Sequence, residues 1–245
     1  MKGDDLILSF DTATNNCSIA ITNGDFGQGR VLGSLSLNSG VTHSRRLLTA
    51  VECLMQNLEL ALVDIAAVAV GLGPGSFTGL RIGMATAKGL CHGSSKPLVG
   101  VSSLDAIAAG VYSEKLICVV MDARKKEVYS CFYRYNTGKV ARRCSQPVVL
   151  PPQELAEQIS EPVIMAGDGI DVYNAVLADV LGDRLETATP LHRFPEATNI
   201  GFLAATEHAD ENYLDLDQAK PDYVRSSDAQ LSLVSPIAKG KTKNQ

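Results

Sequence analysis

The sequence predicts a duplicated α/β fold, in which two domains each place strands before helices. The chain of 245 residues is long enough for two domains of roughly 100–130 residues, each with its own core. Its apolar share of 45% is that of an ordinary globular protein. The order strand-strand-strand-helix-strand-helix-strand-helix occurs in the first half, and because strands followed by helices recur with different residues in the second, we assign both halves this order. We therefore expect an N-terminal domain over residues 1–112, a C-terminal domain over 113–230 and a polar, disordered tail over 231–245.

The first half opens with three strands. Leu6–Asp11 is an apolar run that ends in a carboxylate, and Cys17–Thr22 alternates small and branched residues. Asn23-Gly24-Asp25 is a turn signal, and Arg30–Leu37 supplies a third strand with regularly placed apolar residues. Three strands that follow one another through short turns predict an antiparallel meander.

Helices and single strands then alternate. Ser44–Leu62 carries its apolar residues on one stripe, and Ile65–Gly71 is a short apolar strand. Leu80–His92 has helical character but is apolar nearly all round. Such a helix is covered on more than one side, either by its own domain or by a partner. Pro97–Val101 as a strand and Leu104–Tyr112 as a helix complete the first domain.

The second half repeats the pattern after a junction near 110–115. We expect three strands, then a helix, a strand and two further helices, in the order Leu116–Met121, Glu127–Tyr135, Lys139–Leu150, Pro152–Ile159, Pro162–Ala166, Asp171–Leu181 and Ala197–Glu211.

Charge and cysteine content limit the classes of function. The formal net charge is −5, so the chain is a poor nucleic-acid binder by itself, because binding phosphates needs clustered Lys and Arg. The six cysteines form no CxxC pair, which favours reduced, buried thiols. The longest apolar stretch, Leu58–Val70, is too short to span a bilayer. We expect a cytoplasmic protein without a membrane segment.

Two segments of the first half are candidates for binding phosphate. Asp11 and Thr12 follow the first strand, where a carboxylate and a hydroxyl can approach a nucleotide or its magnesium, or can close a local turn instead. Gly71–Arg81 lies between a strand and a helix, and offers Gly73, Gly75, Ser76 and Thr78. Its glycines either let backbone N–H groups approach an anion or allow tight packing in a rigid turn. The spacing favours neither.

The corresponding loop of the second half, Asp122–Tyr129, lacks glycines and contains three consecutive basic residues. We interpret it as a solvated hairpin tip. None of the four histidines pairs with another within a helical turn, and no GxSxG motif is present. We therefore predict no catalytic residue and no metal site, and we interpret His43 as a capping or interface residue.

Several segments together resemble the TsaB/YeaZ family. They occur in the family's order from residue 6 to residue 225, most clearly in the first half and thinly between 140 and 215. The segments are Ile7–Thr14 with Cys17–Ala20, His43-Ser44 followed by Leu47-Leu48, Gly73–Gly83, Gly100–Leu104, Asp122–Arg124 with Glu127–Tyr129, and Pro221–Arg225.

The resemblance implies an actin/hexokinase/Hsp70-like fold of the ASKHA superfamily, which is ribonuclease H-like. It implies a non-catalytic scaffold and activating subunit that works with TsaD and the ATPase TsaE. That complex transfers a threonylcarbamoyl group from threonylcarbamoyl-AMP to N6 of adenosine 37 in tRNAs that read codons starting with A. TsaD-like proteins hold a metal through an HxxxH pair, which this sequence lacks.

The resemblance also implies partners. The two N-terminal helices would pack on TsaD in a heterodimer, or on a second copy in a homodimer when TsaD is absent. The expected interface residues are His43, Leu47, Leu48, Val51, Leu80, Arg81, Met84, Ala87 and Leu90. In this interpretation Leu80→Asp and Met84→Asp abolish association and leave the chain folded. No cofactor is bound tightly, ATP or ADP lies at the interface with TsaD, and tRNA is reached only through the complex.

Three other functions compete with this interpretation. A stand-alone phosphotransferase of the same fold is disfavoured by the glycine-free loop at Asp122 and by Ala13, where such kinases usually place a glycine. A protease is disfavoured because no nucleophile–base pair is evident. An interaction protein unrelated to tRNA is compatible with the sequence.

Overall fold

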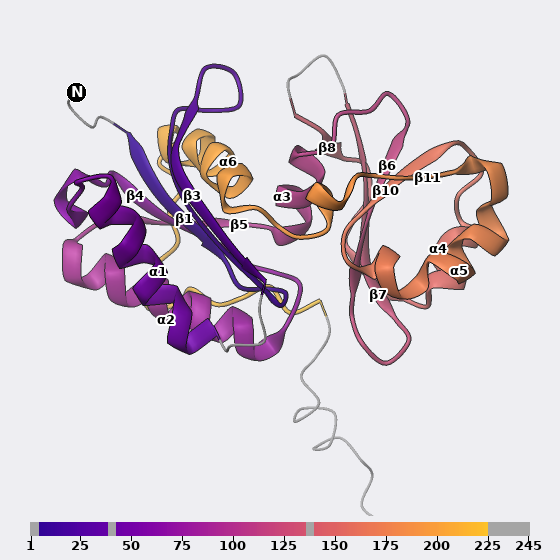
Figure 1. Ribbon diagram of the computed structural model, residues 1–245, viewed down its shortest axis with the longest axis horizontal. Helices are drawn as coiled ribbons and strands as arrows, with labels where there is room; N and C mark the ends of the chain where they lie inside the picture. The colour runs from indigo at the N-terminus through magenta and orange to yellow at the C-terminus, as the bar shows by residue number, and fades with distance from the viewer. Residues whose placement is uncertain (1–4, 39–42, 136–139, 225–245) are drawn as a thin grey trace, which may run out of the picture.

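The computed structural model describes residues 5–38, 43–135 and 140–224. These residues form two lobes, each built on a sheet with helices against it (Figure 1). The tail expected over 231–245 lies outside the described residues. None of the helices within these ranges is long and apolar enough to cross a membrane.

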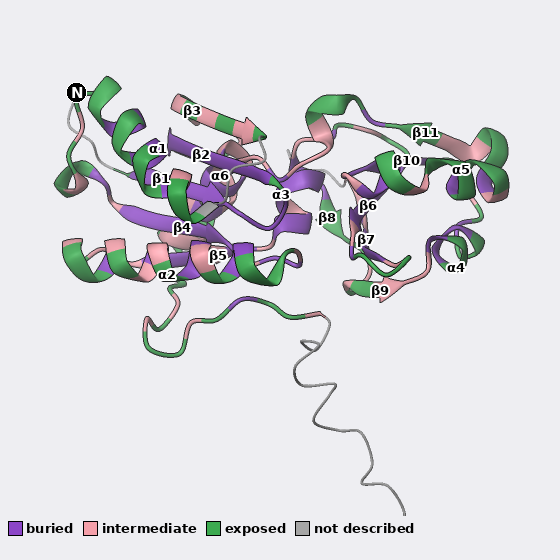
Figure 2. Ribbon diagram, turned by 60° about the horizontal axis from the view of Figure 1, so that its bottom comes forward, coloured by how far each residue is buried: buried purple, intermediate pink, exposed green. Residues whose placement is uncertain are grey.

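The sheet of the first lobe has the strand order β3-β2-β1-β4-β5. The first three strands form the predicted antiparallel meander, and β4 and β5 run parallel to β1. The strands are β1 (Leu6–Asp11), β2 (Asn16–Asn23), β3 (Arg30–Asn38), β4 (Ala67–Gly71) and β5 (Leu98–Val101). Every residue of β1 and β4 is buried, which explains why both read as continuous apolar runs (Figure 2).

Helices α1 (His43–Asn57) and α2 (Phe77–Ser94) cover one face of this sheet. Helix α1 ends before the predicted Leu62, because Glu59 takes a left-handed conformation with φ 54°. Helix α2 starts before the predicted Leu80, where the Ser76 hydroxyl accepts a hydrogen bond from the Gly79 N–H at 3.3 Å.

The sheet of the second lobe repeats the same neighbour relations, in the order β11-β10-β6-β7-β8. Strands β6 and β7 are antiparallel, and β10 and β11 run parallel to β6. The bounds are β6 (Leu116–Asp122), β7 (Val128–Arg134), β8 (Arg142–Arg143), β9 (Val148–Leu150), β10 (Val163–Ala166) and β11 (Leu185–Thr187), with helices α4 (Pro152–Glu157) and α5 (Gly169–Leu181). The predicted duplication is therefore confirmed.

Two strands of this lobe differ from expectation. The predicted strand Lys139–Leu150 is divided into β8 and β9, which both pair with β7. Between them the Ser145 hydroxyl accepts the Phe132 N–H at 2.9 Å, so that a side chain replaces a main-chain partner. Strand β11 was not predicted, because three residues carry too short a pattern.

The last helix of each half packs against the sheet of the other half. Helix α3 (Ser103–Ala109) contacts β6 and β7, and lies between the two lobes in Figure 1. Helix α6 (Ala197–Ala209) crosses back and covers the free face of the first sheet. The expected division at residue 112 therefore assigns α6 to the wrong lobe. Its Ile200 and Ala204 complete the core above Ile7 in the first lobe.

A C-terminal strap, residues 212–224, continues along the first lobe. The Leu214 N–H donates to the Leu98 carbonyl at 2.9 Å, and the Asp222 N–H donates to the Leu72 carbonyl at 2.9 Å. The strap covers the edge of β5 and ends between the lobes.

Candidate functional site

A cavity of about 480 Å³ lies between the lobes, beside the ends of β1 and β6. Both lobes and the strap contribute to it. Its walls are made by Ala13, Thr14 and Asn15 after β1, by Pro74–Phe77 and Leu80 at the start of α2, by Met121–Lys125, Tyr129 and Asp168 of the second lobe, and by Asp222–Val224.

Asp11 and Thr12 lie beneath this cavity and do not line it. Each side chain is only 1% exposed. The Asp11 carboxylate accepts the Ala13 N–H at 2.7 Å and the Ser103 hydroxyl at 2.6 Å, and the Thr12 hydroxyl donates to the Gly79 carbonyl at 2.8 Å. Burial raises the pKa of Asp11 to about 6, although the hydrogen bonds that its carboxylate accepts from Ser103 and Ala13 favour the ionised form. In this arrangement both side chains bond to the chain's own groups, and a ligand contact at Asp11 or Thr12 stays a prediction.

The glycine-rich loop is a tightly packed turn. A Cβ at Gly75 would overlap the Ala13 carbonyl oxygen, and a Cβ at Gly79 would overlap that of Thr12. Gly73 has φ 99°, and its carbonyl accepts the Ser103 N–H at 2.8 Å. Of the six predicted phosphate contacts, only Gly75 and Ser76 line the cavity. Gly73 is buried, and Thr78 is exposed outside the cavity. The structure thus agrees with the packing interpretation of the glycines.

The wall of the second lobe is a network of carboxylates. Asp122 accepts hydrogen bonds from the Arg124 N–H at 2.9 Å and the Tyr173 hydroxyl at 3.1 Å. Asp168 accepts the Asp122 N–H at 3.0 Å, and burial raises the pKa of Asp168 to about 6. The predicted hairpin tip has left-handed backbone at three consecutive residues, with φ of 60°, 54° and 63° at Arg124, Lys125 and Lys126. Residues other than glycine rarely adopt the left-handed conformation, and several such residues in succession are unusual.

Sequence reasoning missed two contributors to the cavity. Asp168 follows β10 between Gly167 and Gly169, a strand-end signal like that of Asp11, and it could have been found. Tyr223 belongs to the strap and lies far in sequence from the lining residues of the two lobes. The Tyr223 ring packs on the Phe77 ring with centroids 5.3 Å apart, and the Arg81 guanidinium lies 3.8 Å from the Phe77 ring centroid.

The predicted partner residues divide into two groups. The first group is turned into the core of the chain itself and is 5% exposed or less; its members are Leu47, Val51, Leu80, Met84 and Ala87. This corrects the expectation that Leu80→Asp and Met84→Asp leave the chain folded. Leu48 is 56% exposed, Arg81 is exposed and Leu90 is half-buried, whereas the side chain of His43 lies outside the described residues.

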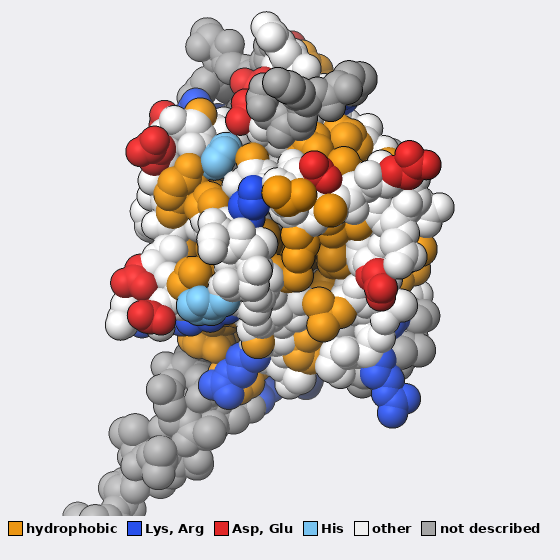
Figure 3. Space-filling view, turned by 90° about the vertical axis from the view of Figure 1, so that its left-hand side faces the viewer, with side chains coloured by type: hydrophobic (Ala, Val, Ile, Leu, Met, Phe, Trp, Pro, Cys, Tyr) orange, Lys and Arg blue, Asp and Glu red, His pale blue; other side chains and the backbone are white. Residues whose placement is uncertain are grey.

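The outward face of α2 begins with the larger Phe77 and Arg81, and farther along the helix it carries small residues together with His92. Ala85, Gly89 and Gly93 are exposed, and a Cβ at either glycine would meet nothing within 4 Å. Seen from the side of the first lobe, the surface has a central strip of hydrophobic side chains with acidic residues on both flanks (Figure 3). Within the described ranges, no group of three or more His, Cys, Asp or Glu side chains is arranged to hold a metal ion.

Comparisons with known proteins agree on one family. The family model of TsaD, tRNA N6-adenosine threonylcarbamoyltransferase, matches residues 38–233. A Bacillus subtilis (strain 168) protein named tRNA threonylcarbamoyladenosine biosynthesis protein TsaB is 31% identical over 227 residues, covering 91% of this chain and 96% of that protein. The Escherichia coli (strain K12) protein of the same name is 33% identical over 225 residues, covering 85% and 94%.

Solved structures give the same result. YeaZ from Pseudomonas aeruginosa superposes with a TM-score of 0.72 at 28% identity, over 90% of this chain and 100% of that one. Component A of (R)-2-hydroxyglutaryl-CoA dehydratase from Acidaminococcus fermentans reaches a TM-score of 0.51 at 11% identity, over 84% of this chain and 100% of that one, a likeness of fold alone. Because sequence and structure point to one family over nearly the whole chain, this protein belongs to the TsaB/YeaZ family, and its two lobes are the duplicated actin-like (ASKHA) fold expected from the sequence.

Proposed function

We propose that this chain is the TsaB-type subunit of the system that forms threonylcarbamoyladenosine in tRNA, and that it contributes no catalytic site. The names of its relatives in Bacillus subtilis and Escherichia coli support a role in this biosynthesis. One observation supports the proposal that the chain contributes no catalytic site. The loops at which a kinase of this fold would hold phosphate are packed against each other, with Gly75 on Ala13 and Gly79 on Thr12. A phosphate group could not enter between the paired backbones without displacing backbone atoms.

The outer face of α1 and α2 is the surface that we assign to the partner TsaD, or to a second copy when TsaD is absent. Small residues on α2 support this assignment, because they allow a second helix to approach closely. Leu48 supplies an exposed apolar side chain on α1, the helix that packs against α2. In the same proposal TsaE joins this pair in the cytoplasm, ATP or ADP is held where TsaD contacts this chain, and tRNA binds through the complex.

The proposal is tested by reconstitution. Threonine incorporation into unmodified tRNA is measured with TsaC, TsaD and TsaE from the same organism, with and without this chain. Incorporation that depends on the chain is expected. Equal incorporation in its absence would contradict the proposal.

A pair of variants then tests the surface. Gly89→Arg places a long charged side chain on the outer face of α2, and it is expected to abolish capture of TsaD and to lower incorporation. Ala175→Arg, at an exposed position of α5 in the second lobe, is the matched control and should behave as the parent does. Full capture of TsaD by Gly89→Arg would show that the partner binds elsewhere.

A further inference from the structure

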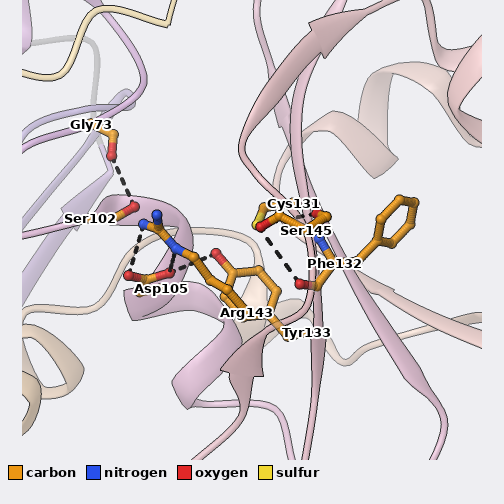
Figure 4. Close-up of polar contacts among 8 residues, drawn as sticks. All are labelled: Gly73, Ser102, Asp105, Cys131, Phe132, Tyr133, Arg143 and Ser145. Carbon is orange, nitrogen blue, oxygen red and sulfur yellow. Dashed lines mark hydrogen bonds and ion pairs between the residues drawn. The ribbon is translucent and has the colours of Figure 1, made fainter.

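Three side chains join the two lobes through one carboxylate (Figure 4). The Arg143 guanidinium donates to both carboxylate oxygens of Asp105, from Nε to Oδ1 at 2.6 Å and from Nη2 to Oδ2 at 2.9 Å. The Tyr133 hydroxyl donates to the same Oδ1 at 2.8 Å. Asp105 belongs to α3, which comes from the first half of the chain, whereas Tyr133 and Arg143 belong to β7 and β8 of the second sheet.

Helix α3 is also fixed to the first lobe at its start. The Ser102 hydroxyl donates to the Gly73 carbonyl at 3.3 Å, and the Ser103 hydroxyl donates to buried Asp11 at 2.6 Å. Movement of α3 with the second lobe would therefore break contacts to the loop beneath the cavity. Movement with the first lobe would break both bonds from Arg143 and the one from Tyr133.

Burial strengthens the hydrogen bond at the Tyr133 end of this cluster, whereas the side chains of Arg143 and Asp105 keep 37% and 31% of their surface exposed. Tyr133 is 1% exposed, and burial, together with the nearby Asp105 carboxylate, raises the pKa of its hydroxyl, so that it remains a donor. A planar guanidinium that meets a carboxylate through two bonds also fixes the relative orientation of the two groups. Apolar contacts act in the same direction, because Leu104 and Ile107 lie in one core cluster with Val119 of β6.

The strap lies close to the same charges. Burial raises the pKa of Asp222, and the nearby Arg143 guanidinium offsets part of that rise. Asp222 and Tyr223 form part of the cavity wall. The positive charge of Arg143 thus stabilises the contact between the lobes and also the ionised form of Asp222 in the strap, which borders the cavity.

We propose that Asp105, Tyr133 and Arg143 form an interlobe latch that holds the two lobes at one angle and so fixes the width of the cavity between them. Two-lobed proteins commonly bind ligands by closing about a hinge, which needs an interface that can slide or open. The latch prevents the interface between the two lobes from sliding or opening in this way. The inference does not depend on the proposed role in tRNA modification.

The test measures the distance between the lobes in the full-length protein. Exposed Cys53 and Cys144 are replaced by Ser, and Ala209→Cys on α6 and Asp179→Cys on α5 carry spin labels at exposed positions of the first and second lobe. The labelled protein is diluted with unlabelled protein, so that only distances within one chain are recorded. Double electron–electron resonance then gives the distance distribution.

Arg143→Ala is expected to broaden this distribution at least roughly twofold, because both guanidinium bonds that fix the angle between the lobes are lost. Arg134→Ala is the matched control, because Arg134 lies on β7 and pairs with Glu161 within the second lobe. It should leave the distribution narrow. An Arg143→Ala distribution as narrow as that of the parent would overturn the proposal, and so would equal broadening by Arg134→Ala. If Arg143→Ala fails to fold, Asp105→Asn and Tyr133→Phe, which preserve side-chain shape, carry the same expectation and the same contradicting results.

Discussion

At the scale of single residues, Asp11 makes stability depend on pH in an unusual direction. Its pKa is about 6 in the folded chain, above the ordinary value of 3.8. Between these values the folded state binds a proton that the unfolded state does not. The free energy of unfolding therefore rises as the pH falls through 6, and this contribution levels off near 4.

Asp11→Asn mimics the protonated carboxyl and should remove this dependence. Relative to the parent, we expect the variant to be more stable at pH 7.5, by up to about 3 kcal/mol, with the difference vanishing toward pH 4. Urea unfolding of both proteins across this pH range measures it. A constant difference between the two at all pH values would show that Asp11 does not titrate in this way.

Two glycines of one helix should respond in opposite ways to alanine. Gly79→Ala forces a methyl group into the Thr12 carbonyl, and we expect a loss of about 3 kcal/mol or more. Gly89→Ala meets open space on the same helix, and should gain about 0.5–1 kcal/mol through helix propensity. Chemical denaturation followed by circular dichroism compares them. Similar effects of both changes would contradict the packing explanation of the glycine-rich loop.

The residues also show which part of the site was visible in the sequence. Asp11 stood out because it ends β1, and Gly75 because it lies in a glycine-rich turn between β4 and α2. Gly75 does line the cavity between the lobes. Their roles depend on Ser103 and Ala13, and the first of these partners is 92 positions away from Asp11. Local patterns identify a turn, but they do not indicate whether its polar groups face a ligand or face one another.

At the scale of elements, the strength of the periodic pattern decided which predictions succeeded. The meander of β1, β2 and β3 and the stripe of α1 were found, because long segments average out individual exceptions. Strands β8 and β11 have two and three residues and leave almost no pattern. Helix α6 was found as a helix but given to the wrong lobe, because its sequence does not reveal which sheet it covers.

The return of α6 leads to a prediction about fragments. A fragment of residues 1–112 contains the whole first sheet but lacks the helix that covers one of its faces. Its Ile7, Ala67 and Val99 would then be exposed to water, so we expect it not to fold alone. Mixing it with residues 113–245 should restore the circular dichroism spectrum of the intact chain. Cooperative unfolding of 1–112 by itself would contradict this.

At the scale of the whole molecule, the exchange of α3 and α6 makes each lobe depend on the other. The core cluster around α3 contains residues of both halves, from Ala13 and Leu80 to Val119 and Tyr133. Duplicated domains that merely touch would each keep their own helices. Here each sheet is completed by a helix from the other half, and the latch adds polar bonds across the same boundary.

This arrangement predicts that the lobes unfold together. The chain contains no tryptophan, so one introduced tryptophan reports on one lobe. Phe26→Trp places a reporter beside Phe202 in the first lobe, where the two rings are 5.2 Å apart, and Phe132→Trp places one on β7 of the second. We expect the two fluorescence transitions in urea to share one midpoint, because loss of either sheet removes the helix that completes the other. Two midpoints, with circular dichroism changing in two matching steps, would mean that the exchanged helices do not couple the lobes.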